Sequence, residues 1–200
     1  MLKLLCYLFF YYSISLQIIA DQRVNKIPRE LRDVDIFEKR GDRVDLDLEF
    51  YDEKGTKHPL KDYFKEKKPV VLILGYYECP RLCNLLFNGF SLSAKSLEWS
   101  IGKEFNVVTV SIDTREKPKL AAEKKHAYTK LYGRRSAKKG WHFLTGEQKE
   151  ISALTKQVGY QYKYHKKIDQ FAHAAVLMFL TPDGQISRYL YGIDFKYNDL

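Results

Sequence analysis

The pattern of apolar and polar positions predicts a series of short strands along the chain. Residues 44–50 alternate between apolar and acidic side chains, which is typical of a half-buried strand. A turn at residues 52–55 and a second short strand then complete an N-terminal β-hairpin. Residues 69–76 and 105–112 are almost continuously apolar, as expected for strands that are buried on both faces of a sheet.

Three stretches have helical patterns, and the remaining apolar segments indicate strands. Apolar residues from Cys83 to Leu97 fall on one side of a helix. A second helix runs from Pro118 to Leu131 and a third covers residues 147–158, and in both a glycine follows the last turn. Because residues 181–184 form a strong turn signal, they join the last two predicted strands into a hairpin. These further strands cover residues 141–144, 174–180 and 185–191.

The order of these elements indicates the fold class. Between the two hairpins, strands alternate with helices, which predicts an α/β fold with a central, partly parallel sheet covered by helices. We therefore expect a thioredoxin-like three-layer sandwich of the glutaredoxin/peroxiredoxin type, with an extra β-hairpin at its N-terminal end. Two hundred residues, 45% of them hydrophobic, suffice for one compact domain, which we assign to residues 44–200.

The first twenty residues have the layout of a secretory signal peptide. Lys3 is the only charged residue in 1–20, and an apolar run is followed by small and polar residues up to the expected cleavage site. Residues 4–20 are also just long enough for an uncleaved membrane anchor. We expect export to a bacterial periplasm, as a soluble protein or anchored to the inner membrane by residues 4–20. Residues 21–43 are charged and indicate a linker or an extended arm.

The charge balance favours anionic partners. Lysine and arginine exceed aspartate and glutamate by 34 − 25 = 9. Such an excess favours acidic proteins or an anionic membrane, and no nucleic-acid-binding motif accompanies it. Clusters of lysines could steer an acidic partner toward the protein, and they lie at residues 65–68, 124–125 and 166–167.

Two cysteines stand directly after the strand predicted at residues 69–76. Cys79 and Cys83 are separated by three residues, and the second one opens the following helix. Side chains at this place lie at the carboxyl end of a buried strand, where open α/β sheets usually carry their sites. Two thiolates select Cu(I) or Zn(II) among common ions, but the same spacing also suits a redox pair or a structural disulfide. The spacing alone does not separate these three interpretations.

A third ligand would favour the metal site, and His173 is the candidate. It directly precedes the strand predicted at residues 174–180, and small alanines on both sides leave room for its ring. In a thioredoxin-like fold, the segment that enters this strand lies beside the loop that carries the cysteines. Most isolated histidines are surface or structural residues, and His165, in a lysine-rich loop, is a weaker candidate.

Four blocks of sequence stand in order along the chain and carry a family resemblance. They are residues 75–84 around the two cysteines, residues 111–115, residues 140–146, and residues 171–193 around His173. Together they resemble the Sco/SenC family of copper-binding assembly factors for cytochrome c oxidase. The resemblance runs from about residue 25 to the C-terminus.

The resemblance implies a copper site and a role in oxidase assembly. Cys79 and Cys83 would bind Cu(I) or Cu(II) as thiolates, and His173 would bind it as an imidazole. The protein would be a metallochaperone for the CuA centre, with cytochrome c oxidase subunit II and other copper chaperones as candidate partners, and not primarily an enzyme. The alternatives are a thiol-disulfide oxidoreductase that uses Cys79 and Cys83, and an interaction domain with a structural disulfide.

Overall fold

The computed structural model describes residues 34–200. The signal or anchor segment expected at residues 1–20, and most of the arm expected at residues 21–43, lie outside the described residues. At the described end of that arm, Ile36 forms an antiparallel β-bridge with Tyr160. No helix within the described part of the chain is both long enough and apolar enough to cross a membrane.

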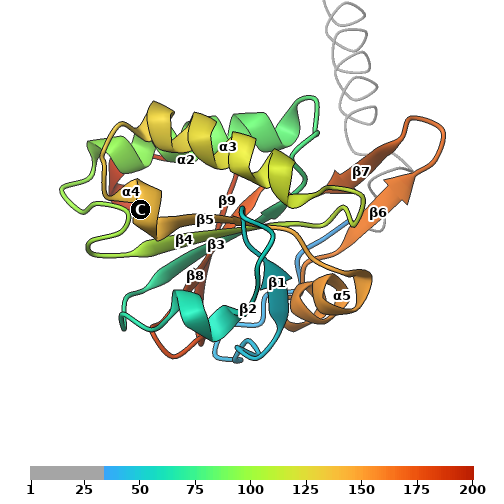
Figure 1. The fold of residues 1–200 in the computed structure, drawn as a ribbon, viewed down its shortest axis with the longest axis horizontal. Helices are drawn as coiled ribbons and strands as arrows, with labels where there is room; N and C mark the ends of the chain where they lie inside the picture. Colours follow the sequence, from blue (N-terminus) through green and yellow to red (C-terminus); the bar gives the residue numbers. More distant parts are fainter. Residues whose placement is uncertain (1–33) are drawn as a thin grey trace, which may run out of the picture. The chain divides into compact units, whose positions relative to one another are not determined.

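A five-stranded mixed sheet forms the centre of the domain (Figure 1). Its strands are β3 (Val70–Gly75), β4 (Asn106–Ser111), β5 (Trp141–Leu144), β8 (Val176–Leu180) and β9 (Ile186–Tyr191). They lie in the order β5-β4-β3-β8-β9, in which β3, β4 and β5 run parallel and the other two pairings are antiparallel. Every residue of β3 and β4 is buried, as the two apolar runs of the sequence predicted.

Helices cover both faces of this sheet and give the three layers of a thioredoxin-like α/β fold. α2 (Leu82–Ser96) and α3 (Pro118–Tyr132) lie side by side over one face, and α5 (Gln148–Gln157) lies on the other side (Figure 1). α3 ends at Tyr132 and is followed by Gly133, whose φ of 84° is left-handed and suits glycine. The sequence did not predict the shorter helices, which are α4 (Ala137–Gly140), η2 (Leu60–Tyr63) and η3 (Tyr197–Asp199).

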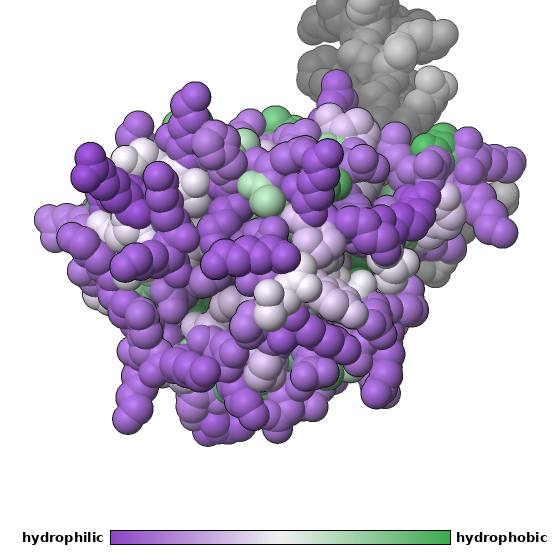
Figure 2. Space-filling view, in the orientation of Figure 1, coloured by the Kyte–Doolittle hydropathy of each residue, from purple (hydrophilic) through white to green (hydrophobic). Residues whose placement is uncertain are grey.

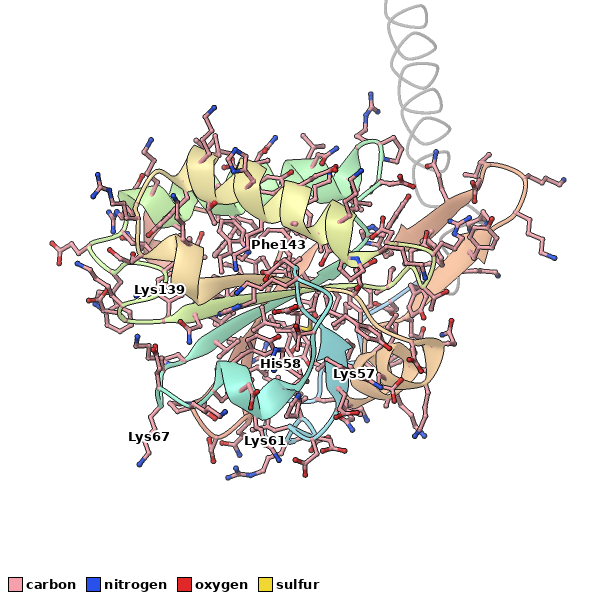
Figure 3. The ribbon with its side chains drawn as sticks, viewed as in Figure 1. Lys57, His58, Lys61, Lys67, Lys139 and Phe143 are labelled. Atoms are coloured by element: carbon pink, nitrogen blue, oxygen red, sulfur yellow. The ribbon has the colours of Figure 1, made fainter. Side chains whose placement is uncertain are left out.

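Aromatic side chains fill the space between the sheet and the two long helices. Phe143 of β5 lies inside the domain, with the ring of Tyr128 stacked on it at 6.0 Å and the ring of Phe87 at 6.2 Å (Figure 3). Next to them, Trp141 meets Phe90 edge-on at 5.4 Å. Complete burial of one such ring stabilises a fold by about 1.5–3 kcal/mol. The cluster therefore fixes α2, which carries one of the two cysteines, against the sheet.

The N-terminal hairpin is present, but its first strand is shorter than predicted. β1 (Glu49–Tyr51) pairs antiparallel with β2 (Lys57–Pro59), whereas residues 44–48 turn instead of extending the strand. The carboxylate of Asp45 accepts a hydrogen bond from the backbone N–H of Asp47 at 2.9 Å. Aspartate side chains compete in this way with the backbone hydrogen bonds of a strand ladder. The alternation of acidic and apolar residues therefore predicted a strand that is longer than β1.

A second hairpin, which the sequence did not predict, projects from one edge of the domain (Figure 1). β6 (Tyr162–His165) and β7 (Gln170–His173) pair antiparallel in a two-stranded sheet of their own. In β6 two tyrosines alternate with Lys163 and His165, a short period that our sequence analysis overlooked, whereas the four residues of β7 show no alternation. His165 therefore lies in a strand and not in the lysine-rich loop that we expected. The C-terminal hairpin of β8 and β9 is confirmed.

Candidate metal centre

The two cysteines lie where the first central strand gives way to a helix. β3 ends at Gly75, and the chain turns so that the N–H of Cys79 donates to the carbonyl of Tyr76 at 3.4 Å. Cys83 lies in the first turn of α2, and its N–H donates to the Cys79 sulfur at 3.4 Å. The turn that leads into α2 and the first turn of this helix therefore bring the two sulfurs within 4.8 Å of each other.

His173 approaches these sulfurs from the end of β7. Its Nε2 lies 3.1 Å from the Sγ of Cys83, although the two residues are 90 positions apart in the sequence. The donor atoms of Cys79, Cys83 and His173 all lie within 4.8 Å of one another. The structure thus brings together the three residues that the sequence singled out. Within residues 34–200, no other three His, Cys, Asp or Glu side chains gather in this way.

A backbone carbonyl determines which nitrogen of His173 faces the sulfurs. The Nδ1 of His173 lies 3.0 Å from the carbonyl oxygen of Ala174. Because a carbonyl only accepts hydrogen bonds, Nδ1 is the donor of this pair, and Nε2 is the nitrogen that faces the sulfurs. The rings of Tyr76 and Tyr160 lie 5.8 Å and 6.3 Å from the imidazole and hold it from two sides. The imidazole therefore turns Nε2, the nitrogen that a metal ion would bind, toward the sulfurs.

The two thiols are electrostatically different. Cys83 is 1% exposed and Cys79 is 6% exposed. The hydrogen bond from Cys83 lowers the pKa of the Cys79 thiol well below its ordinary value. Burial raises the pKa of the Cys83 thiol. The pair therefore holds a thiolate at Cys79 and a proton at Cys83, and a metal ion that binds both sulfurs has to displace that proton.

The end of β3 makes room for the Cys83 sulfur. A Cβ atom on Gly75 would lie only 2.9 Å from this sulfur. The backbone N–H of Tyr76 donates to the same sulfur at 3.4 Å. Both Cys79 and Cys83 are free thiols and do not form a disulfide in this structure. Both sulfurs are thus available as ligands, and the Cys83 sulfur packs against the backbone at Gly75 and Tyr76.

A buried carboxylate holds the loop that precedes Cys79. Glu116, which is 5% exposed, accepts hydrogen bonds from the backbone N–H groups of Tyr77 at 2.8 Å and Glu78 at 2.7 Å. It also accepts one from the hydroxyl of Ser111, and burial raises its pKa. Our sequence analysis missed Glu116. Its place just after β4, the strand next to β3, is the signal that could have revealed it.

The remaining histidines do not join the centre. His165, the weaker candidate from the sequence, lies on β6 opposite Gln170. His58 hydrogen-bonds a carboxylate of η2, and His126 is exposed on α3. His142 lies on β5, where its ring packs against that of a tyrosine. Of the described histidines, only His173 stands with the two cysteines.

Comparison with models of known protein families assigns the chain to one of them. A family model described as SCO1/SenC matches residues 38–196, a range that includes both cysteines and His173. The chain belongs to the SCO1/SenC family. A comparison with curated protein sequences found no match to this SCO1/SenC protein.

Solved structures resemble this SCO1/SenC protein across most of its length. A protein from Aquifex aeolicus VF5 aligns with a TM-score of 0.68 and 25% identity, over 80% of this chain and 89% of that one. A SCO1/SenC family lipoprotein from Bacillus anthracis str. Ames gives 0.63 and 17%, over 80% and 90%. ScoI from Arabidopsis thaliana, solved with copper bound, gives 0.60 and 16%, over 76% and 88%. The last two similarities show the shared fold.

The chemistry of the donor set fits copper. Thiolates are soft ligands that favour Cu(I), and imidazole binds copper in either common oxidation state. Structural zinc sites instead use four protein ligands, and the described residues bring only three together here. A three-ligand centre leaves room at the metal for a further ligand.

Proposed function

We propose that this SCO1/SenC protein binds one copper ion through Cys79, Cys83 and His173 and delivers it during assembly of the CuA centre of cytochrome c oxidase. The convergence of the three donor atoms carries the proposal, with the Nε2 of His173 3.1 Å from the Cys83 sulfur. Membership of the SCO1/SenC family and the copper bound to the ScoI relative support copper as the metal.

The same three ligands explain how copper could be released as well as held. A three-coordinate Cu(I) ion accepts a thiolate from a partner before one of its own ligands leaves, so copper moves through shared coordination. Cys79 is the more exposed of the two cysteines, at 6% against 1%, and is where this exchange would begin. The partners in this proposal are subunit II of cytochrome c oxidase and other copper chaperones.

The proposed location is the exported side of a bacterial inner membrane. Its support is the charge and hydropathy pattern of residues 1–20, with a single lysine before an apolar run. Cell fractionation of the full chain, with mass spectrometry of its N-terminus, tests this part. Recovery from the cytoplasm with Met1 and Lys3 intact would contradict it.

Anaerobic titration of Cu(I) into the reduced protein tests the copper site. We expect one copper ion per chain and nearly complete loss of tight binding in Cys79→Ala and Cys83→Ala. The variant His173→Ala should weaken binding more than tenfold, or about 1.4 kcal/mol. His126→Ala is the matched control, because this histidine is exposed on α3 outside the centre. Undiminished copper affinity in His173→Ala would remove the imidazole from the proposed site.

A thiol-disulfide oxidoreductase is the second candidate, and the lowered pKa of Cys79 favours it. The Cys79 thiolate would attack one sulfur of a partner disulfide, form a mixed disulfide and release one partner thiolate. The Cys83 thiolate would then attack the Cys79 sulfur and release the second partner thiolate. Two electrons pass to the partner, and a Cys79–Cys83 disulfide remains on this protein.

Reduction of a CuA-domain disulfide by the metal-free, reduced protein tests this second function. If it operates, Cys83→Ala should accumulate the mixed disulfide, because the resolving thiolate is absent. Reduction no faster than that by free glutathione, together with tight copper binding, would leave copper delivery as the function.

A further inference from the structure

The loop that follows β4 contacts both halves of the metal centre. On one side, Glu116 holds the backbone that leads into Cys79. On the other side, the neighbouring residue Arg115 reaches the β6–β7 hairpin, which ends in His173. Two adjacent residues therefore support the cysteine segment and the histidine segment separately.

Arg115 is fixed to the domain through Asp113. Its Nε donates to both carboxylate oxygens of Asp113, at 2.9 and 3.0 Å, and its Nη2 donates to one of them at 2.7 Å. The backbone N–H of Arg115 donates to the same carboxylate at 2.9 Å. The Asp113 side chain is only 4% exposed, so the guanidinium is held on a buried anchor just beyond β4.

From this anchor, Arg115 contacts both strands of the hairpin and its turn. Its Nη1 donates to the carboxylate of Asp169 at 2.6 Å and to the hydroxyl of Tyr164 at 3.4 Å. The Tyr164 hydroxyl in turn donates to the same Asp169 oxygen at 2.6 Å. The guanidinium also lies 5.2 Å from the ring of Tyr164 and 5.9 Å from the ring of Phe171. One side chain thus joins the hairpin to the end of β4.

The position of this hairpin matters because His173 is its last residue. β6 and β7 form a sheet of their own, so no ladder of hydrogen bonds to the central sheet fixes their tilt. A change in tilt moves the imidazole relative to Cys83. Metal–ligand distances tolerate only about 0.2 Å of error, so a small movement is enough to weaken coordination.

We propose that Arg115 is a positioning residue for His173, which holds the hairpin so that the imidazole already faces Cys83 before copper arrives. The inference rests on the proposed copper site. A preorganised ligand raises affinity because binding no longer has to order it. An isolated exposed ion pair would contribute little, but here bonds to two carboxylates and contacts with two rings act together.

Copper affinities of single and double variants test whether Arg115 acts through His173. Arg115→Ala should weaken Cu(I) binding about tenfold in the wild-type background. It should have little effect once His173→Ala has removed the imidazole, because the two effects are coupled. Glu116→Gln provides the contrast, since it acts on the cysteine loop and should weaken binding in both backgrounds.

Amide hydrogen exchange of the metal-free protein provides a readout that needs no copper. Arg115→Ala should speed exchange in residues 162–173 at least tenfold. Asp169→Asn should do so to a smaller extent, because asparagine accepts the φ of 49° at this turn but lacks the charge. Arg188→Ala is the matched control, because Arg188 lies over an aromatic ring as Arg115 does, but on β9, where it donates to a backbone carbonyl at 2.8 Å. It should change neither exchange in the hairpin nor copper affinity.

Two results would overturn the role of Arg115. The first is equal weakening of copper binding by Arg115→Ala with and without His173, because the arginine would then act on the cysteines or on the whole fold. The second is unchanged exchange in the hairpin. If the wild-type protein bound no copper, the proposed function would fail, whereas the exchange experiment would still decide whether Arg115 orders the hairpin.

Discussion

A few atoms around the two sulfurs determine how a metal ion would be bound. The carbonyl of Ala174 selects the tautomer of His173, and the absence of a side chain at Gly75 lets the Cys83 sulfur lie against backbone. Each of these features places a lone pair and contributes little apolar burial. Substitutions at such positions should therefore weaken metal binding as well as change the stability of the fold.

The substitution Gly75→Ala tests the effect of one added carbon atom beside the Cys83 sulfur. The added Cβ would lie 2.9 Å from the Cys83 sulfur, closer than such contacts normally are, so the sulfur has to move. We expect at least tenfold weaker Cu(I) binding and a loss of about 1–3 kcal/mol in unfolding free energy from overpacking. Copper titration and urea denaturation measure the two effects.

Gly89→Ala is the control for the glycine substitution. Its Cβ would meet the backbone oxygen of Ile193, away from the sulfurs, so it should destabilise the fold without weakening copper binding by the folded fraction. Equal copper affinities for Gly75→Ala and wild type would show that the sulfur tolerates displacement.

The sequence predicted the residues of the centre better than the residues that hold them. Cysteines at the end of a buried strand are visible in a local pattern, and the place of His173 just before a late strand made it the candidate third ligand. The family resemblance then implied its role as a copper ligand. Glu116 and Arg115 act through hydrogen bonds to segments 38 and 54 residues away. Their place just after β4 indicates a site, but the local sequence does not show which distant segment each residue bonds. Their supporting roles therefore emerged only from the structure.

The same distinction applies to whole elements. α3 was predicted closely because its proline start, its glycine end and its helical period agree. The β6–β7 hairpin was missed because its strands have only four residues each, so the alternation of tyrosines with polar residues in β6 is too short to stand out. The hairpin is stabilised by contacts between aromatic rings, such as Tyr76 with Phe171 at 5.4 Å. Elements with strong local signals could be read from the sequence, whereas elements stabilised mainly by tertiary contacts could not.

At β5, His142 should make the stability of the domain depend on pH. Burial and the nearby Lys125 lower its pKa to about 4, below the ordinary value of about 6.5. The folded domain thus keeps the ring neutral, while the unfolded chain takes up the proton. The contribution of the neutral His142 ring to the free energy of unfolding is fully present above pH 6.5, and it is lost as the pH falls toward 4. Between pH 6.5 and 4.5 we expect wild type to lose about 2 kcal/mol more unfolding free energy than His142→Gln does.

Urea denaturation at a series of pH values measures this difference. His126→Gln is the control, because it removes one exposed histidine and leaves His142 in place. Parallel pH profiles for wild type and His142→Gln would show that the ring titrates normally in the folded domain.

Across the whole molecule, positive charge is concentrated on the side formed by α3 and α4. Residues 117–139 contain nine lysines and arginines and one acidic residue, Glu123. Hydrophilic side chains cover the face of the molecule over α3 (Figure 2). Lys124 reaches from this face to Asn84, directly after Cys83, so the basic face adjoins the loop that carries the cysteines. An acidic partner attracted to this face would therefore arrive near the proposed copper site.

Charge reversal on this face tests such steering. The double variant Lys130→Glu, Lys138→Glu should slow association with an acidic CuA domain about tenfold at low ionic strength, because the long-range attraction is reduced. The control is Lys61→Glu, Lys67→Glu, which changes the net charge equally but at side chains that project from the η2 end of the domain (Figure 3). At 0.5 M salt, where the screening length falls to about 4 Å, both variants should associate at the wild-type rate. Equal slowing by the two variants would mean that net charge alone matters, and a rate independent of salt would exclude steering by either face.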